Sequence, residues 1–458
     1  MKRFSHFLFV SMFLFVPALV AQDSRTVTEP VFPPACTRLD AQLSVDASGI
    51  AAADEAKLDT DRIQKAIDDC AKGRAVELSA QGTNNAFLSG PLNLRTGVTL
   101  LVNKGVTLFA SRDPALFARS PGSCGLVNDS EASSGCKPLI SVDHAPDAGI
   151  MGDGIIDGRA GERMLGTKVS WWDLPGHLPT GQHQQVPRIL LADYSDNFTL
   201  YRITLKNSPF FHVVYNHGNG FTIWGLKIDT PKLYAPNADG IDPGAGSKNI
   251  TITHSFIRAG DDNVAIKGGT GGVTNMTISH NHFYWGHGMS IGSETNGGVS
   301  KIRVFDLSLD GPDSAIRIKS NTTRGGLVHD VVYDDVCIRD SPYPINIDSR
   351  YSLGGKLPGD LIPEYRDVTL HNVRISGGGL IWIHGYSNDH RAAVNLDGVL
   401  LKDADTAKYT YSIDHADIHL GPGPVNLKPI GTDSTLTGTA GSGSLGSCEY
   451  KFVPFPHP

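Results

Sequence analysis

The 458-residue chain has few charged residues and no excess of positive charge. Asp, Glu, Lys and Arg make up 19% of it, and the formal net charge is -7. Proteins that bind nucleic acid are usually basic, so no nucleic-acid partner is expected. A helix-rich composition is also missing, because 51 glycines and 27 prolines are spread along the chain, and both residues interrupt helices.

Long apolar runs are missing after the first twenty residues. The chain opens with Lys2 and Arg3, followed by a mostly apolar run over 7–20, which is short for a membrane span. We interpret 1–21 as a secretory signal peptide cleaved after Ala21, with an uncleaved signal anchor as the alternative. The mature chain is therefore expected to be secreted, extracellular or periplasmic, and to have no membrane segment. A monomer is also expected.

Cysteine is scarce, and its spacing does not resemble a zinc site. In an exported protein these residues are expected to form disulfides. Cys124 and Cys136 close a short loop and are the first candidates for a pair, whereas the sequence leaves the other pairings open. The six cysteines are Cys36, Cys70, Cys124, Cys136, Cys337 and Cys448.

Short runs of alternating apolar and polar residues recur through the chain, as in strands with one buried face. Their offsets are 23, 29, 26, 26, 29, 37 and 26 residues, counted between Phe198, Phe221, Ile250, Met276, Ile302, Val331, Val368 and Val394. A period in the twenties indicates a β-solenoid, whereas a propeller blade needs about 40 residues. An immunoglobulin-like sandwich lacks such a period. We predict an all-β fold, a right-handed parallel β-helix over 93–415.

The two ends are expected to differ from the repeat. Residues 22–92 should form an N-terminal cap, in which Ile63, Ala66, Ile67 and Cys70 have helical spacing. The helix could begin at Asp59, Thr60 or Asp61 and stop at Gly73. Residues 416–458 are expected to be a C-terminal tail that packs on the solenoid. The offset of 37 indicates an inserted loop over 351–365.

The same period brings charged residues together, because residues one coil apart lie above one another in a solenoid. Each aspartate alone would more often be a turn residue, the histidine a satisfied polar group and the cations a solvated face. The combination is costly, and perturbed pKa values are expected within it. The converging set is Asp239, Asp261, Asp262, His287, Arg317 and Lys319.

Such a cluster suits the cleavage of a glycosidic bond. One carboxylic acid must protonate the leaving oxygen, and another carboxylate must activate water or attack carbon. Crowding raises the pKa of one carboxyl while its neighbours stay ionised. Arg317 and Lys319 indicate a sugar that itself carries a carboxylate.

At these residues the sequence resembles the polygalacturonases of glycoside hydrolase family 28, and among them bacterial secreted endo-acting enzymes. The family's blocks are Asn-Thr-Asp, Gly-Asp-Asp, Gly-His-Gly and Arg-Ile-Lys, and its active-site tyrosine matches Tyr351. Ala238 departs from the usual threonine, so a hydroxyl beside Asp239 is missing. The blocks stand here as Asn237-Ala238-Asp239, Gly260-Asp261-Asp262, Gly286-His287-Gly288 and Arg317-Ile318-Lys319.

The resemblance implies inverting hydrolysis of polygalacturonic acid, the backbone of pectin, without metal or cofactor. Asp261 would be the general acid, Asp239 and Asp262 would hold and activate water, and His287 would tune the acid. The implied substrate-binding residues are Asn237, Arg317, Lys319 and Tyr351.

Four alternatives remain open on the sequence alone. An exo-polygalacturonase needs a wall at one end of the binding surface, for which the 124–136 and 351–365 loops are candidates. A rhamnogalacturonan hydrolase would act on another pectin. A pectate lyase would use calcium-bound carboxylates and an arginine base. A non-catalytic carbohydrate-binding β-helix would have only Ala238 in its favour.

Overall fold

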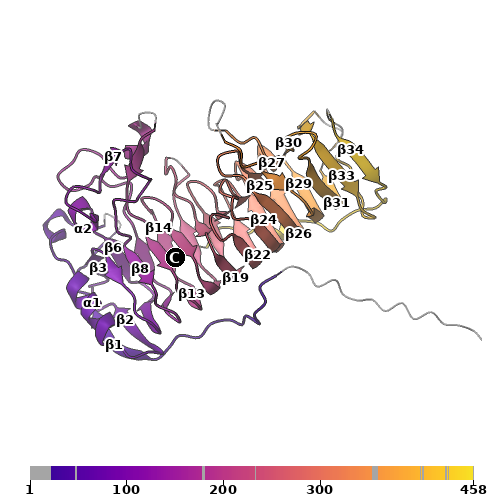
Figure 1. The fold of residues 1–458 in the computed structure, drawn as a ribbon. Coiled ribbons are helices and arrows are strands. Elements are labelled where there is room, and N and C mark those ends of the chain that lie inside the picture. The colour runs from indigo at the N-terminus through magenta and orange to yellow at the C-terminus, as the bar shows by residue number, and fades with distance from the viewer. Residues whose placement is uncertain are drawn as a thin grey trace, which may run out of the picture.

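The computed structural model describes residues 22–456 except 47–48, 178–180, 233, 353–358, 403, 405–406, 429–430 and 432. The predicted signal peptide and part of the expected 351–365 insertion lie outside the described residues. Strands dominate, and they stack along one axis as successive coils (Figure 1). The predicted parallel β-helix is confirmed, because the pairings within both large sheets are parallel.

One sheet carries or borders the candidate functional residues described below. It has 11 strands, each pairing with the equivalent strand one coil away. They are β4 (Leu92–Asn93), β8 (Ile140–Asp143), β12 (Leu190–Asp193), β15 (Val213–Asn216), β18 (Ile241–Pro243), β21 (Val264–Ile266), β23 (Met289–Ile291), β25 (Ser314–Lys319), β27 (Tyr343–Asp348), β30 (Gly379–His384) and β32 (Tyr409–Asp414).

The remaining faces belong to a 21-stranded sheet. Its strands are β1 (Ala35–Asp40), β2 (Arg74–Ser79), β3 (Ala86–Ser89), β5 (Val98–Val102), β6 (Thr107–Ala110), β9 (Gly149–Met151), β10 (Ile155–Asp157), β13 (Phe198–Tyr201), β14 (Thr204–Lys206), β16 (Asn219–Trp224), β17 (Lys227–Asp229), β19 (Ser247–Thr253), β20 (Phe256–Arg258), β22 (Val273–Phe283), β24 (Val299–Asp310), β26 (Leu327–Arg339), β28 (Glu364–Tyr365), β29 (Val368–Ser376), β31 (Ala392–Leu401), β33 (Ala416–Leu420) and β34 (Thr435–Gly438).

The register of this sheet follows the sequence period residue by residue. Phe198 pairs with Phe221, Phe221 with Ile250, and Ile250 with Met276. The later markers pair in the same way as far as Val394. The ladder extends beyond the range expected for the solenoid, since β1 and β2 precede residue 93 and β33 and β34 follow residue 415.

The interior is a continuous stack of aliphatic residues, because alternate residues of each strand point inward. Ile241, Val264, Met289, Ile316 and Ile345 are completely buried in one core that runs through the coils. The intervening residues of the 11-stranded sheet face outward, which leaves that column available for polar side chains.

The N-terminal end is covered by α1 (Thr60–Asp69), as predicted, with Ile63 and Ile67 fully buried in the core. Its N-cap is Asp59, one of the three expected candidates. The expected stop at Gly73 is wrong. The helix ends at Asp69, and the next residue, Cys70, is extended and joined to Cys36 of β1 by a disulfide. Gly73 lies in the following turn, with φ +76°.

Short elements decorate the coils. They are α2 (Pro114–Phe117), the 3-10 turns at Ala52–Asp54, Leu174–His177 and Glu449–Lys451, and an antiparallel ribbon of β7 (Leu126–Asn128) and β11 (His183–Gln185). None of the described helices is long and apolar enough to cross a membrane.

Both terminal segments run back along the outside of the solenoid (Figure 1). Near the N-terminus, Asp23 accepts a hydrogen bond from Thr251 at 2.8 Å. The C-terminal tail is fixed by the Cys337–Cys448 disulfide and by Lys451, whose ammonium lies 2.6 Å from Asp306. These two contacts join the last residues of the chain to β26 and β24.

Removing the Cys337–Cys448 bridge should loosen the tail. The bridge spans 111 positions, and a loop of this length stabilises the folded state by about 4–5 kcal/mol in the chain-entropy model. We expect the variant with both Cys337→Ala and Cys448→Ala to unfold at a lower temperature and to be cleaved first within 421–448 by a protease. Unchanged melting and an intact tail would contradict this expectation.

Candidate active site

The residues predicted to converge do lie on, or just before, successive strands of the 11-stranded sheet. Asp239 stands just before β18, the Asp261–Asp262 pair before β21, and His287 before β23. The two cations, Arg317 and Lys319, belong to β25. The period read from the sequence therefore brings these residues onto one face.

Main-chain hydrogen bonds between neighbouring coils place Asp239 beside the aspartate pair. The amide of Gly260 donates to the carbonyl of Ala238 at 3.1 Å, and that of Gly240 to the carbonyl of Asp262 at 2.8 Å. The amide of His212 donates to the Asp239 carbonyl at 2.8 Å. These main-chain bonds fix the backbone on both sides of Asp239 without a hydroxyl at position 238, where the completely buried Ala238 stands.

Asp262 is held by three donors and is fully buried. Arg317 Nη1 lies 3.1 Å from one carboxylate oxygen, Lys319 Nζ lies 2.9 Å from the other, and Ser290 Oγ donates at 2.6 Å. Burial raises the pKa of Asp262, but the charges of Lys319 and Arg317 hold it well below its ordinary value. The Tyr351 ring centre is 5.6 Å from the Arg317 guanidinium and 5.4 Å from the Lys319 ammonium.

Asp261 forms an ion pair with His287, whose Nδ1 lies 2.9 Å away. Their side chains are 22% and 34% exposed, against 3% for Asp239 and 1% for Asp262. Burial raises the pKa of Asp261, but the hydrogen bond from His287 brings it below its ordinary value. From the sequence, crowding was expected to raise the pKa of one carboxyl. In the absence of substrate, Asp261 does not have that raised pKa.

Within this cluster, the carboxyls with raised pKa values are those of Asp239 and Asp242. Asp239 was predicted from the sequence, whereas Asp242 was missed. Burial and mutual repulsion raise the pKa of Asp239, and burial raises that of Asp242 to about 8. Neither carboxylate oxygen of Asp242 has a hydrogen-bond partner among the described residues. Asp242 stands only three positions after Asp239, on the outward side of β18, and this spacing could have identified it.

Lys267 is a second residue that sequence reasoning missed, five positions after Asp262. Its ammonium lies 3.6 Å from Asp239, 3.9 Å from Asp242 and 3.8 Å from Glu294. Burial lowers the pKa of Lys267, but Asp239 and Asp242 raise it well above its ordinary value. The lysine therefore carries the positive charge that offsets these neighbouring carboxylates.

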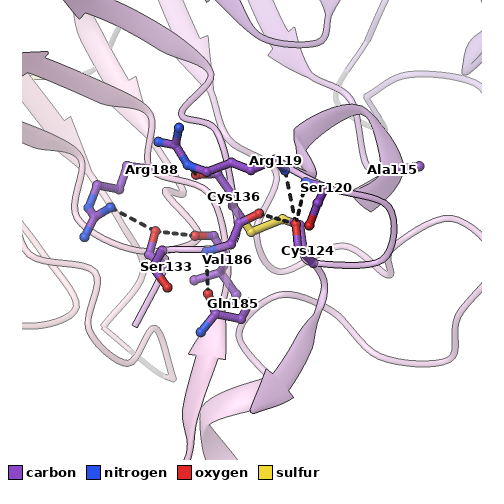
Figure 2. Close-up of a disulfide and its surroundings, with 12 residues drawn as sticks. Ala115, Arg119, Ser120, Cys124, Ser133, Cys136, Gln185, Val186 and Arg188 are labelled. Carbon is purple, nitrogen blue, oxygen red and sulfur yellow. Dashed lines mark hydrogen bonds between the residues drawn. A yellow bond between two sulfur atoms is a disulfide. The ribbon is translucent and has the colours of Figure 1, made fainter. Parts of the chain in front are cut away.

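Asn237 contacts a wall beside the sheet, which consists of the antiparallel ribbon of β7 and β11 and the loop closed by Cys124 and Cys136. Its side-chain oxygen accepts a hydrogen bond of 2.9 Å from Gln184, on β11 of the antiparallel ribbon. The predicted Cys124–Cys136 disulfide is confirmed and ties this wall together (Figure 2). Nothing in the spacing of the chain marked Gln184, because it stands outside the repeat.

Arg188 belongs to the same wall and donates to Ser133 at 3.0 Å (Figure 2). Its guanidinium lies 5.1 Å from the ring centre of Phe210. Burial lowers the pKa of Arg188 to about 10, so it stays protonated at neutral pH.

Ligand atoms of Asp261, Asp262 and His287 lie within 4.8 Å of one another, a spacing at which side chains can hold a metal ion. Both oxygens of Asp262 already face cationic side chains, and His287 Nδ1 contacts Asp261. These contacts already place positive charge around both carboxylates. The arrangement fits acid–base chemistry next to an anionic group.

Comparison with known proteins gives a consistent result. The family model described as glycosyl hydrolases family 28 matches residues 70–415. An endo-polygalacturonase of Pectobacterium carotovorum subsp. carotovorum is 42% identical, covering 86% of this chain and 93% of that protein. A polygalacturonase of Ralstonia nicotianae is 36% identical, covering 95% and 93%.

A solved structure of a polygalacturonase from Erwinia carotovora ssp. carotovora superposes with a TM-score of 0.78 at 41% identity. The superposition covers 87% of this chain and 100% of the Erwinia chain. The predicted family is thus confirmed, and the chain belongs to glycoside hydrolase family 28.

Proposed function

We propose that the protein is an endo-acting polygalacturonase that cleaves the α-1,4-galacturonosyl linkages of polygalacturonate by inversion. The observation that carries the proposal is the pairing of Arg317 and Lys319 with the buried Asp262, one strand from the Asp261–His287 pair. The cations give a uronate carboxylate a partner next to groups that can donate and accept protons.

Asp261 is proposed as the general acid, since it is the most exposed of the three aspartates. A substrate carboxylate at Lys319 would neutralise a charge that lowers the pKa of Asp261. The pKa would then rise towards the value that an acid needs to hold its proton. His287 would share that proton through its hydrogen bond.

Asp239 is proposed as the base, with Asp262 holding the attacking water beside it. Asp239 and Asp242 repel one another, and one proton on the pair relieves the repulsion. Asp242 is the better place for that proton, because its buried oxygens have no partner in the described part of the chain. Asp239 then remains ionised, near the Lys267 ammonium.

Endo action is supported by the relative from Pectobacterium, which is named as endo-acting. We propose a secreted protein that acts as a monomer, since one chain carries all these residues. Its three disulfides fit an oxidising compartment.

Incubation with polygalacturonic acid tests the proposal as a whole. Endo cleavage lowers viscosity early, while few reducing ends have formed and the products are mixed oligomers. Proton NMR of the first product should detect the inverted β-anomer. Monomer or dimer appearing alone, with viscosity hardly changed, would indicate exo action, and a first α-anomer would refute inversion. An unsaturated product that chelators suppress would indicate a lyase.

Replacing the proposed acid should remove hydrolysis but leave binding. We expect Asp261→Asn to lower kcat by roughly 10²–10⁴, because an amide cannot protonate the leaving oxygen. Affinity for oligogalacturonates should stay within a few-fold of wild type, measured by calorimetry. Activity near that of wild type would exclude this role for Asp261.

The charge of Lys267 should set the acidic limb of the pH profile. Lys267 lowers the pKa of Asp239, so Lys267→Met should raise that pKa and move the acidic limb of kcat/KM to higher pH. Asp242→Asn, which mimics the protonated carboxyl, should keep most of the turnover. Lys104→Met, at an exposed turn, is the control. An unmoved limb in Lys267→Met, or an inactive Asp242→Asn that still folds, would contradict these assignments.

A further inference from the structure

A cavity of about 710 Å³ lies at the N-terminal end of the sheet face that carries the catalytic candidates. Asn93 of β4 and Ser141 of β8 line it, as do Arg119 and Lys137, which flank the disulfide-bonded loop 124–136. None of the proposed catalytic or substrate-binding residues lines this cavity. It is therefore a separate site on the same surface.

The register of the sheet connects the cavity with the catalytic candidates. Asn93 pairs with Ser141, Ser141 with Leu191, Leu191 with Val214, and Val214 with Asp242. These residues form one outward column, in which three strand spacings, about 14 Å, separate Ser141 from Asp242. A pyranose unit is about as long as one spacing. A polymer lying along the column would reach the cavity several sugars from the cleaved bond.

The two cations in the cavity are free to bind an anion. Arg119 and Lys137 are exposed, and neither forms an ion pair among the described residues, although Arg119 Nε donates to a main-chain carbonyl. Two acidic residues, Asp61 and Asp143, also line the cavity. Asp143 is already paired with His144, whose Nδ1 lies 2.7 Å away. The cavity therefore contains two cations and two carboxylates on different sides. Lys137 follows Cys136 in the chain and Arg119 donates to the Cys136 carbonyl, whereas Asp61 belongs to α1 and Asp143 to β8.

Local bonds hold the Arg119 side chain beside the Cys124–Cys136 disulfide (Figure 2) and fix the backbone of Lys137 next to it. Arg119 Nε donates to the carbonyl of Cys136 at 3.1 Å, and the Arg119 amide donates to Gly135 at 3.0 Å. The amide of Lys137 donates to the carbonyl of Phe117 at 2.7 Å. A loop that is already ordered loses little entropy when it binds.

We propose that this cavity is a distal subsite for a galacturonate unit, in which Arg119 and Lys137 bind the sugar carboxylate. The proposal rests on the proposed function and adds a second contact for uronate charge, far from Arg317 and Lys319. Long substrates reach it and short ones do not. It therefore favours long, unesterified chains over oligomers.

Kinetics on two substrate lengths test the subsite. The double variant Arg119→Gln with Lys137→Met is compared with Lys104→Met, a control at an exposed turn. On polygalacturonate the double variant should raise KM roughly fivefold, the factor that corresponds to about 1 kcal/mol for an exposed charge pair. On trigalacturonate its KM and kcat should equal those of wild type. Added NaCl should narrow the difference on the polymer.

Each outcome decides the matter. An unchanged KM on polygalacturonate overturns the subsite, and so does an equal rise on trigalacturonate, since the effect would then come from the catalytic centre. A wild-type enzyme that does not cleave polygalacturonate overturns the proposed function instead. If the double variant fails to fold, Lys137→Met alone carries the test, because no hydrogen bond or ion pair from its ammonium is found in the described residues.

Discussion

Parallel hydrogen bonding between coils, in register and about one strand spacing apart, is the constraint on which the rest of this structure depends. It stacks Ile241, Val264 and Met289 inside, and it brings Asp239 and Asp261 to the same face outside. A residue that shifted register by one position would exchange the two faces. The site therefore persists only while the ladder keeps its register.

Close stacking has an electrostatic cost that the site offsets with cations. Carboxylates on neighbouring coils repel one another, and burial adds to the cost of each charge. Arg317 and Lys319 offset the negative charge of Asp262, and His287 forms an ion pair with Asp261. Lys267 lies beside the remaining two carboxylates, Asp239 and Asp242. Because each carboxylate has a different partner, the pKa values separate, which lets similar aspartates have different roles.

The irregular segments build what the ladder lacks. The loop closed by Cys124 and Cys136 raises a wall beside the sheet, and through Gln184 this wall contacts Asn237. Arg119 and Lys137, which flank this loop in the chain, line the cavity at the far end of that face. The regular coils thus provide a straight binding surface, and the segments outside the repeat set the positions along it at which charged side chains can contact a polymer.

The repeat, its register markers, the family and the set of converging residues could all be predicted from the chain alone, because a translational period converts spacing along the chain directly into position in space. The pairing of Phe198 with Phe221 and of Val368 with Val394 followed from that period alone. The pKa values of the site carboxyls, in contrast, depend on the three-dimensional packing. Whether a carboxyl is buried and which cation lies next to it depend on side chains from several coils, so crowding alone did not predict that Asp239 and Asp242, rather than Asp261, have the raised pKa values. The positions of Gln184 and Lys451 were also decided there, since both stand in segments outside the repeat, where no period relates sequence distance to contact.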